Sequence, residues 1–192
     1  MLSSTVLTLA IAGLLSLATS APTTEPVRTA TDRSSWVSVD FQGTTIQYDP
    51  AALVVNNTPA TALESRGTPT ADDSCGSSTF SGGDGPYPLT NDCRALVDWL
   101  NTQNSYFSIW TLTPDYHGVV GSGSCEFGAG TKNIYDTYVG SHDISQLVSD
   151  SIAKFATKTL VGAKGVMGCQ NQCSAKKKRC GQSSVFWTVY HS

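Results

Sequence analysis

Cysteine is the residue type whose number and spacing carry most of the possible chemistry in this chain. There are six: Cys75, Cys93, Cys125, Cys169, Cys173 and Cys180. An even set in an exported chain favours a disulfide framework. The alternative is a zinc site built on Cys169, Cys173 and Cys180, but no second closely spaced Cys or His pair accompanies them. We therefore expect disulfide bonds, and neither a metal nor a cofactor.

Spacing ranks the possible pairings of the six cysteines without fixing one of them. Cys173 and Cys180 flank a short polar loop, so a bond between them would close that loop locally. Among the remaining four, spacing favours Cys75–Cys169 and Cys93–Cys125. Each native bridge in a small secreted domain is typically worth about 2–5 kcal/mol.

Acid–base or nucleophilic catalysis has few candidate residues. The chain has three histidines: His117, His142 and His191. A nuclease-like site needs two imidazoles, or an imidazole and a carboxylate, at one phosphate, and His117 with Glu126 is the best available pair. Ser124 lies in a glycine-rich run similar to an esterase elbow, but that motif requires a strand-to-helix turn and this run leads into a strand. We expect no catalytic residue, and we keep a nuclease or hydrolase using His117 and Glu126 as an alternative.

One dense cluster of charge offers a binding site instead. It is the basic run Lys176, Lys177, Lys178 and Arg179 between the last two cysteines. Four cations on a short loop could meet an anionic cell surface, such as lipid headgroups or a wall polymer, although a run this short is more often a solvated face. A formal net charge of −3 argues against a nucleic-acid partner.

The N-terminal part of the chain indicates export. Residues 1–20 carry no charged side chain, contain a short apolar run and end in small residues, which is typical of a signal peptide rather than a transmembrane anchor. Residues 21–74 form a leader or pro-region rich in Thr, Pro and Ala. Within it, the β-rich runs 36–41 and 44–48 predict a hairpin that either pairs with the main domain or belongs to a separable pro-region. Asn56 begins a glycosylation acceptor pattern.

The segment 75–192 contains the elements that would position these residues. A helix capped by Thr90 or Asn91 is expected to end near residues 101–104, and a second helix is expected to follow Ser141. Aromatic and β-branched runs predict strands at 106–112, 134–139, 166–169 and 185–190. The glycine-rich run 118–127 is expected to be the antiparallel partner of 106–112. The pattern predicts an α+β two-layer sandwich, with two helices over an antiparallel sheet of about four or five strands, stabilised by disulfides.

Six short segments give this domain a recognisable pattern. They are 75–80 (CGSSTF), 88–93 (PLTNDC), 123–128 (GSCEFG), 139–144 (VGSHDI), 161–169 (VGAKGVMGC) and 187–190 (WTVY). Their order and spacing resemble the necrosis-inducing factor family of fungal secreted effectors. That family is similar in pattern to fungal killer toxins with an α/β sandwich. The chain departs from the family pattern in its long leader and in residues 170–182, which carry the extra Cys pair and the basic run.

The resemblance implies a secreted, extracellular protein that promotes host cell death or inhibits competitors without enzymatic chemistry. We expect it to act by binding a cell-surface component of a host or competitor, which could be anionic. A wall-associated structural protein that retains its Thr-rich leader is a further alternative. Three observations distinguish these hypotheses. Cell death would support the effector, turnover of RNA or esters would support the nuclease or hydrolase, and retention in the wall would support the structural protein.

Overall fold

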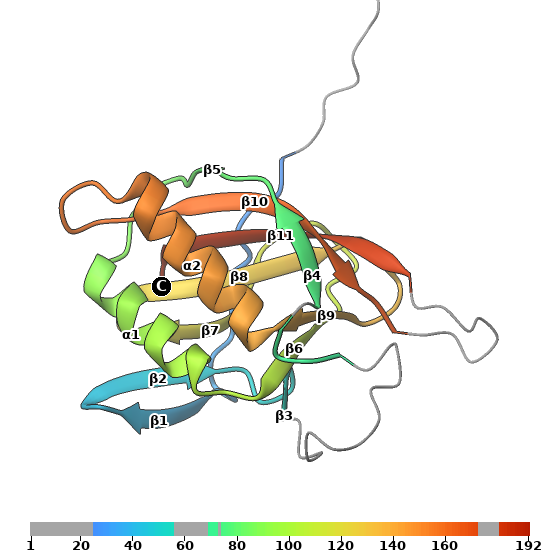
Figure 1. Cartoon of the computed structure of the whole chain (residues 1–192), viewed down its shortest axis with the longest axis horizontal. Helices are drawn as coiled ribbons and strands as arrows, with labels where there is room; N and C mark the ends of the chain where they lie inside the picture. Colours follow the sequence, from blue (N-terminus) through green and yellow to red (C-terminus); the bar gives the residue numbers. More distant parts are fainter. Residues whose placement is uncertain (1–24, 56–68, 73, 173–180) are drawn as a thin grey trace, which may run out of the picture.

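The computed structural model describes residues 25–55, 69–72, 74–172 and 181–192 (Figure 1). Two helices, α1 (Thr90–Asn101) and α2 (Ser141–Phe155), lie among these residues. The strands are β1 (Val37–Phe41), β2 (Thr44–Tyr48), β3 (Leu53–Val55), β4 (Cys75–Ser78), β5 (Ser81–Gly82), β6 (Ser105–Ile109), β7 (His117–Ser122), β8 (Cys125–Thr131), β9 (Thr137–Gly140), β10 (Ala163–Gln170) and β11 (Gln182–His191). The described residues therefore form an α+β fold with two helices, as predicted.

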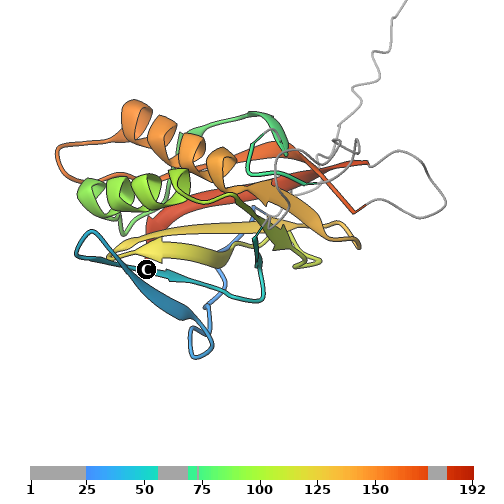
Figure 2. The same ribbon diagram turned by 60° about the horizontal axis from the view of Figure 1, so that its bottom comes forward.

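The strands form two sheets rather than one. The larger sheet has 8 strands in the order β1-β2-β7-β8-β11-β10-β4, with β5 beside β10, and the smaller sheet has the order β3-β6-β9. All pairs between these strands are antiparallel. Figure 2 shows both helices on one face of the larger sheet. This is the expected two-layer arrangement with an additional small sheet.

The expectation of about four or five strands was wrong. The hairpin expected in the leader is β1–β2, and it extends the larger sheet because β2 pairs with β7 from Ile46–Ser122 to Tyr48–Val120. Ile46 is fully buried in the common core. Of the two expectations for this hairpin, the structure shows pairing with the main domain. Removal of residues 21–74 after synthesis stays a prediction.

The expected pairing of 106–112 with 118–127 was also wrong. Residues 117–131 fold back on themselves as the hairpin β7–β8, with Gly123 in the turn at φ +54°. That backbone conformation favours glycine, since a Cβ there is strained. β6 pairs instead with β3 and β9 in the smaller sheet. The run 118–127 was interpreted as one strand because its turn consists of only two residues, Gly123 and Ser124, within a sequence that is rich in glycine throughout.

The core lies between the helices and the larger sheet. Large, fully buried side chains come from every layer, among them Trp187 and Phe127 from the sheet and Leu96 and Ile144 from the helices. The Trp187 ring stacks on Phe127 with centroids 6.3 Å apart. Full burial of one such side chain contributes about 1.5–3 kcal/mol, so this layer supplies the main cohesion between helices and sheet.

Both helices begin one residue away from the expected caps. Leu89 precedes α1 and Gly140 precedes α2, and neither has a side chain that caps the helix. In α2 a carboxylate inside the first turn takes that role: Asp143 accepts a hydrogen bond from the Gly140 amide at 3.0 Å. A negative charge there also suits the positive end of the helix dipole.

Candidate functional site

Two disulfides fasten the edge strand and the first helix to the larger sheet. Cys75 on β4 bonds to Cys169 on β10, where the two residues are direct cross-strand partners with Cα atoms 4.0 Å apart. Cys93 on α1 bonds to Cys125 on β8, and both are fully buried. These are the two pairings that spacing favoured. Cys173 and Cys180, with the clip predicted between them, lie outside the described residues.

A carboxylate–hydroxyl contact lies beside the buried disulfide. The Asp92 carboxylate at the start of α1 accepts two hydrogen bonds from Ser124, one from its amide at 2.7 Å and one from its hydroxyl at 2.6 Å. The Ser124 hydroxyl oxygen in turn accepts from the Leu89 amide at 2.9 Å. Ser124 therefore occupies the β7–β8 turn as a structural link. No imidazole among the described residues is hydrogen-bonded to it, so it lacks the base that a serine nucleophile requires.

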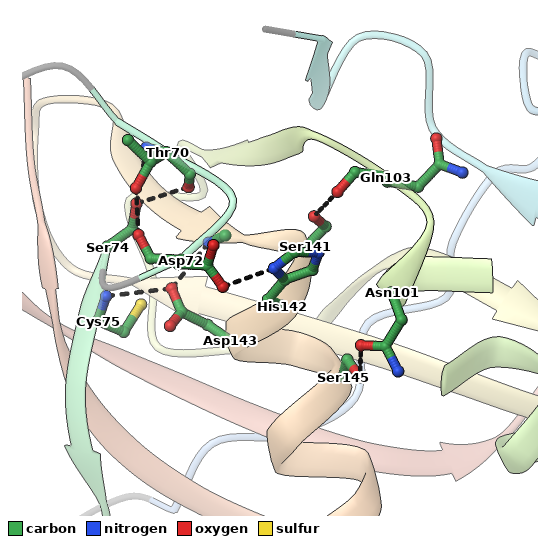
Figure 3. Close-up of polar contacts among 11 residues, drawn as sticks. Thr70, Asp72, Ser74, Cys75, Asn101, Gln103, Ser141, His142, Asp143 and Ser145 are labelled. Carbon is green, nitrogen blue, oxygen red and sulfur yellow. Dashed lines mark hydrogen bonds and ion pairs between the residues drawn. The ribbon is translucent and has the colours of Figure 1, made fainter. Parts of the chain in front are cut away.

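A second polar junction surrounds the first turn of α2 (Figure 3). The Asp143 carboxylate accepts hydrogen bonds from the Gly140 amide and from the Cys75 amide, the latter at 3.1 Å. The helix start is thereby fixed to β4 next to the Cys75–Cys169 bridge. Gly140 is required at this point, because a Cβ on it would overlap the carbonyl of Ala71.

The same junction holds the imidazole of His142. Its Nδ1 lies 2.5 Å from a carboxylate oxygen of Asp72, and its backbone amide donates to the Ala71 carbonyl at 2.9 Å. An imidazole oriented by a carboxylate is half of an acid–base relay. Among the described residues, no hydroxyl or thiol is hydrogen-bonded to the other ring nitrogen, so the contact serves to fasten segment 69–72 to the helix.

The two helices are joined at this end by serine side chains (Figure 3). The Ser141 hydroxyl donates to the Gln103 carbonyl at 2.8 Å, and the Ser145 hydroxyl donates to the Asn101 side-chain oxygen at 2.6 Å. Ser141 and Ser145 are both buried. The segment 139–144 therefore links α1, α2 and β4.

His117 and Glu126 do not converge. His117 is paired with Ala129 of β8, which packs in the core on the helix side of the sheet. Glu126 is three positions from Ala129 on the same strand, and successive side chains of a strand alternate between faces. The imidazole and the carboxylate therefore leave opposite faces of the sheet. The pairing considered for a nuclease or hydrolase is wrong in its geometry.

Glu126 instead belongs to a buried ionic cluster on the sheet face away from the helices. Its side chain is 1% exposed, forms an ion pair with Arg33 and accepts a hydrogen bond from the Tyr190 hydroxyl at 2.6 Å. Arg33 belongs to residues 25–36, which cross this face in the blue segment behind the sheet in Figure 1. The Thr29 amide also donates to the Tyr116 carbonyl at 3.0 Å. This cluster fixes the N-terminal segment to the sheet, and sequence reasoning missed it.

The buried phenol of Tyr190 makes stability sensitive to alkaline pH. Burial raises the pKa of Tyr190 above its ordinary value of about 10. Below that pH the phenol is neutral in both states; above it the unfolded chain loses the proton first, so the free energy of unfolding falls as pH rises. We expect Tyr190→Phe to flatten the decline of melting temperature above about pH 10. Tyr87→Phe at the surface is the control, and equal slopes in both variants would refute the argument.

A shallow, mainly apolar groove opens at the end of the sheet where β10 begins. It encloses about 480 Å³ between the loop after α2 and the segment before α1. Its lining includes Tyr87, Phe155, Leu160 and Gly162. A Cβ on Gly162 would lie 2.5 Å from the Tyr87 ring, so a larger residue at position 162 would displace that ring.

The residues predicted to touch a partner lie outside the described part of the chain. They are the basic run Lys176, Lys177, Lys178 and Arg179. Asn56, which was predicted as a glycosylation position, also lies outside it. Their roles stay predictions. Neither helix of the described ranges is long and apolar enough to cross a membrane.

The fold and the junctions above define a small disulfide-bonded α+β domain whose characteristic segments hold one another in place. The family model described as "Pathogen effector; putative necrosis-inducing factor" matches residues 74–169. The chain therefore belongs to this family of pathogen effectors, as the sequence pattern predicted. The matched residues contain both disulfides, the Asp92–Ser124 contact and the Asp143 junction.

One curated relative extends the comparison. A Penicillium expansum protein named "Probable chitinase LysM18" is 29% identical over 100 residues, which are 49% of this chain and 7% of that protein. The chain thus corresponds to a small part of the relative. Two segments outside the family match complete the larger sheet: the β1–β2 hairpin extends one edge, and β11 lies in the middle between β8 and β10.

Proposed function

We propose that this protein is a secreted effector that promotes cell death in a host, or inhibits a competitor, by binding a cell-surface component. Membership of the effector family supports this role, and two disulfides suit an exported domain. One observation carries the non-enzymatic part of the proposal. The polar side chains of the family segments, such as Asp92, Ser124 and Asp143, are used in holding the fold together.

Turnover of a substrate has weaker support. His117 and Glu126 leave opposite faces of the sheet, and His142 is fastened to Asp72. The chitinase name belongs to a protein of which the matched stretch is 7%, so its activity is not carried over to this chain. A rigid domain that presents a surface is the simpler account of these contacts.

The decisive experiment applies the purified, oxidised protein to leaf tissue and to fungal cells, with ion leakage and viability as readouts. We expect cell death, with His117→Ala and His142→Ala as active as the natural protein. Loss of activity in a folded His117→Ala variant, together with release of nucleotides from RNA or cleavage of an ester, would overturn the binding mechanism. If no tested cell is harmed, the proposed activity is refuted. Retention in the fungal wall fraction would then favour the structural alternative.

The basic run supplies a second, separate prediction. Changing Lys176, Lys177, Lys178 and Arg179 to glutamate is expected to weaken attachment to anionic cells at least about tenfold, since each cation near such a surface contributes about 1 kcal/mol. The effect should fade as salt is added. Arg94→Glu on the exposed side of α1 is the control. Unchanged attachment and unchanged salt dependence would show that the run is only a solvated loop.

A further inference from the structure

Four large apolar side chains are exposed together at one end of the molecule. Trp110 is 63% exposed and Leu112 is 53% exposed on the β6–β7 loop, while Ile134 is 69% exposed and Tyr135 is 50% exposed on the β8–β9 loop. We call these four residues the apolar tip. Large apolar side chains gathered at a surface mark interaction sites, whereas single ones need no explanation.

Contacts at the bases of the two loops place these loops side by side. Ile109, just before Trp110, pairs with Thr137, which follows the β8–β9 loop. Thr111, just after Trp110, exchanges hydrogen bonds with Thr131, which precedes that loop: its hydroxyl donates to the Thr131 carbonyl at 3.2 Å and accepts from the Thr131 amide at 2.9 Å. Trp110 is therefore held between the two ends of the loop that carries Ile134 and Tyr135.

The tip is fixed in shape before any partner arrives. Asn133 closes the base of its loop, because its amide donates to the Thr131 hydroxyl at 3.2 Å and its side chain donates to the Thr137 hydroxyl at 3.3 Å. Leu112 adopts φ +61°, a conformation that a bulky residue rarely takes. An exposed leucine in strained backbone lowers stability without a folding benefit, and such strain is concentrated at functional sites.

The composition of the tip fits a lipid bilayer better than a polysaccharide. Trp and Tyr have an apolar body with one polar group and are enriched at membrane–water interfaces. A sugar could stack on these rings, but Leu112 and Ile134 offer only aliphatic surface, which suits acyl chains. The tip therefore combines the two kinds of side chain that interfacial anchors use.

The described charged side chains on the two tip loops do not form a cationic patch. Lys132 is exposed on the β8–β9 loop, Asp136 lies on the same loop, and Asp115 on the β6–β7 loop accepts a hydrogen bond from the Val27 amide. The affinity of the tip for a bilayer therefore comes from its apolar side chains and not from charge.

We propose that the apolar tip inserts into the interfacial layer of a phospholipid bilayer. This deepens the proposed function by naming the surface that is bound, and it rests on that function only for the choice of cell. Apolar insertion makes this attachment resistant to salt, because salt screens attraction between charges and leaves apolar burial in place.

Vesicle flotation with a matched pair of glycine variants tests the proposal. Leu112→Gly removes one tip side chain and suits the positive φ, so the melting temperature should be maintained while affinity for vesicles of phosphatidylcholine with phosphatidylserine falls about five- to tenfold. Gln42→Gly is the control, because Gln42 is exposed at φ +54° in the β1–β2 turn. That turn precedes the Ile46–Ser122 pair and so lies toward the C-terminal end of β7, whereas the tip loop enters β7 at its N-terminal end. Gln42→Gly should leave vesicle binding unchanged.

Two further measurements sharpen the test. Trp110 is the most exposed tryptophan among the described residues, so its fluorescence should shift to the blue on vesicles, and Trp110→Phe should remove that shift. Ile134→Asp should weaken binding by roughly a hundredfold, since it replaces an apolar group with an anion.

Each outcome separates this proposal from the proposed function. Equal vesicle binding by Leu112→Gly, Ile134→Asp and the natural protein overturns tip insertion, and so does loss of binding to chitin particles instead of vesicles in these variants. Cell death without any vesicle binding refutes the claim that the tip binds a membrane, but it does not contradict the effector function. Vesicle binding through the tip without harm to any cell supports the inference and refutes the effector function.

Discussion

Replacing Arg33 with alanine is expected to lower the free energy of unfolding by about 3–5 kcal/mol, because it leaves the Glu126 carboxylate buried without its cation. Glu126 is 1% exposed, and it also accepts a hydrogen bond from the neutral Tyr190 hydroxyl. The opposite change should cost less. Arg33 is 32% exposed, so in Glu126→Gln its guanidinium can turn to water, and we expect a loss of about 1–2 kcal/mol.

Urea denaturation of the two single variants and the double variant measures this asymmetry as a double-mutant cycle. Arg94→Ala is the control, since an exposed arginine on α1 should change stability by no more than about 0.5 kcal/mol. If Arg33→Ala and Arg94→Ala destabilise equally, the Arg33–Glu126 pair does not fasten the N-terminal segment to the sheet.

The expected loss also bears on where the folded domain begins. Residues 25–36 contribute Arg33 to a buried carboxylate, and the following hairpin contributes the buried Ile46 to the core. The composition of residues 21–74, rich in Thr, Pro and Ala, gave a boundary at residue 75. That boundary follows the cysteines and the family pattern, whereas the sheet extends to β1 on the N-terminal side.

Much of the scaffold could be predicted because its signals are local. The helix over 90–101 follows from apolar spacing, and β11 follows from strict alternation around Trp187. The Cys75–Cys169 and Cys93–Cys125 bridges are the pairings that spacing favoured, although spacing did not fix them. Sheet membership could not be predicted in the same way, since β6 and β7 have similar strand signals and only tertiary pairing assigns them to different sheets.

The buried Arg33–Glu126 pair and the apolar tip were harder to predict, for physical reasons. Arg33 and Glu126 are 93 residues apart in sequence, so no local pattern marks them as partners. The apolar tip was hidden by its own composition, because Trp110 and Leu112 extend the aromatic run of β6 and look like buried strand. The change from burial to exposure occurs at Ile109, where the pairing with β9 ends.

Removing either disulfide is expected to destabilise the domain by about 4–5 kcal/mol, for different reasons. In the chain-entropy model the Cys75–Cys169 bridge spans 94 residues and the Cys93–Cys125 bridge spans 32, which gives about 4.7 and about 3.7 kcal/mol. The shorter bridge also fills the core, since both of its cysteines are fully buried, so replacing them with alanine adds a packing loss of about 1 kcal/mol. The two double variants should therefore have similar denaturation midpoints.

Hydrogen exchange should distinguish the two variants where the midpoints do not. β4 is a four-residue edge strand held to β10, to the Asp143 carboxylate and, through Ser78, to the Trp187 indole at 2.7 Å. In Cys75→Ala with Cys169→Ala, faster exchange should be concentrated in β4. In Cys93→Ala with Cys125→Ala it should spread through α1 and β8, because the helix loses its covalent attachment to the middle of the sheet. If the free energies of unfolding of both variants lay within about 1 kcal/mol of that of the natural protein, packing and not the sulfur links would hold this effector domain together.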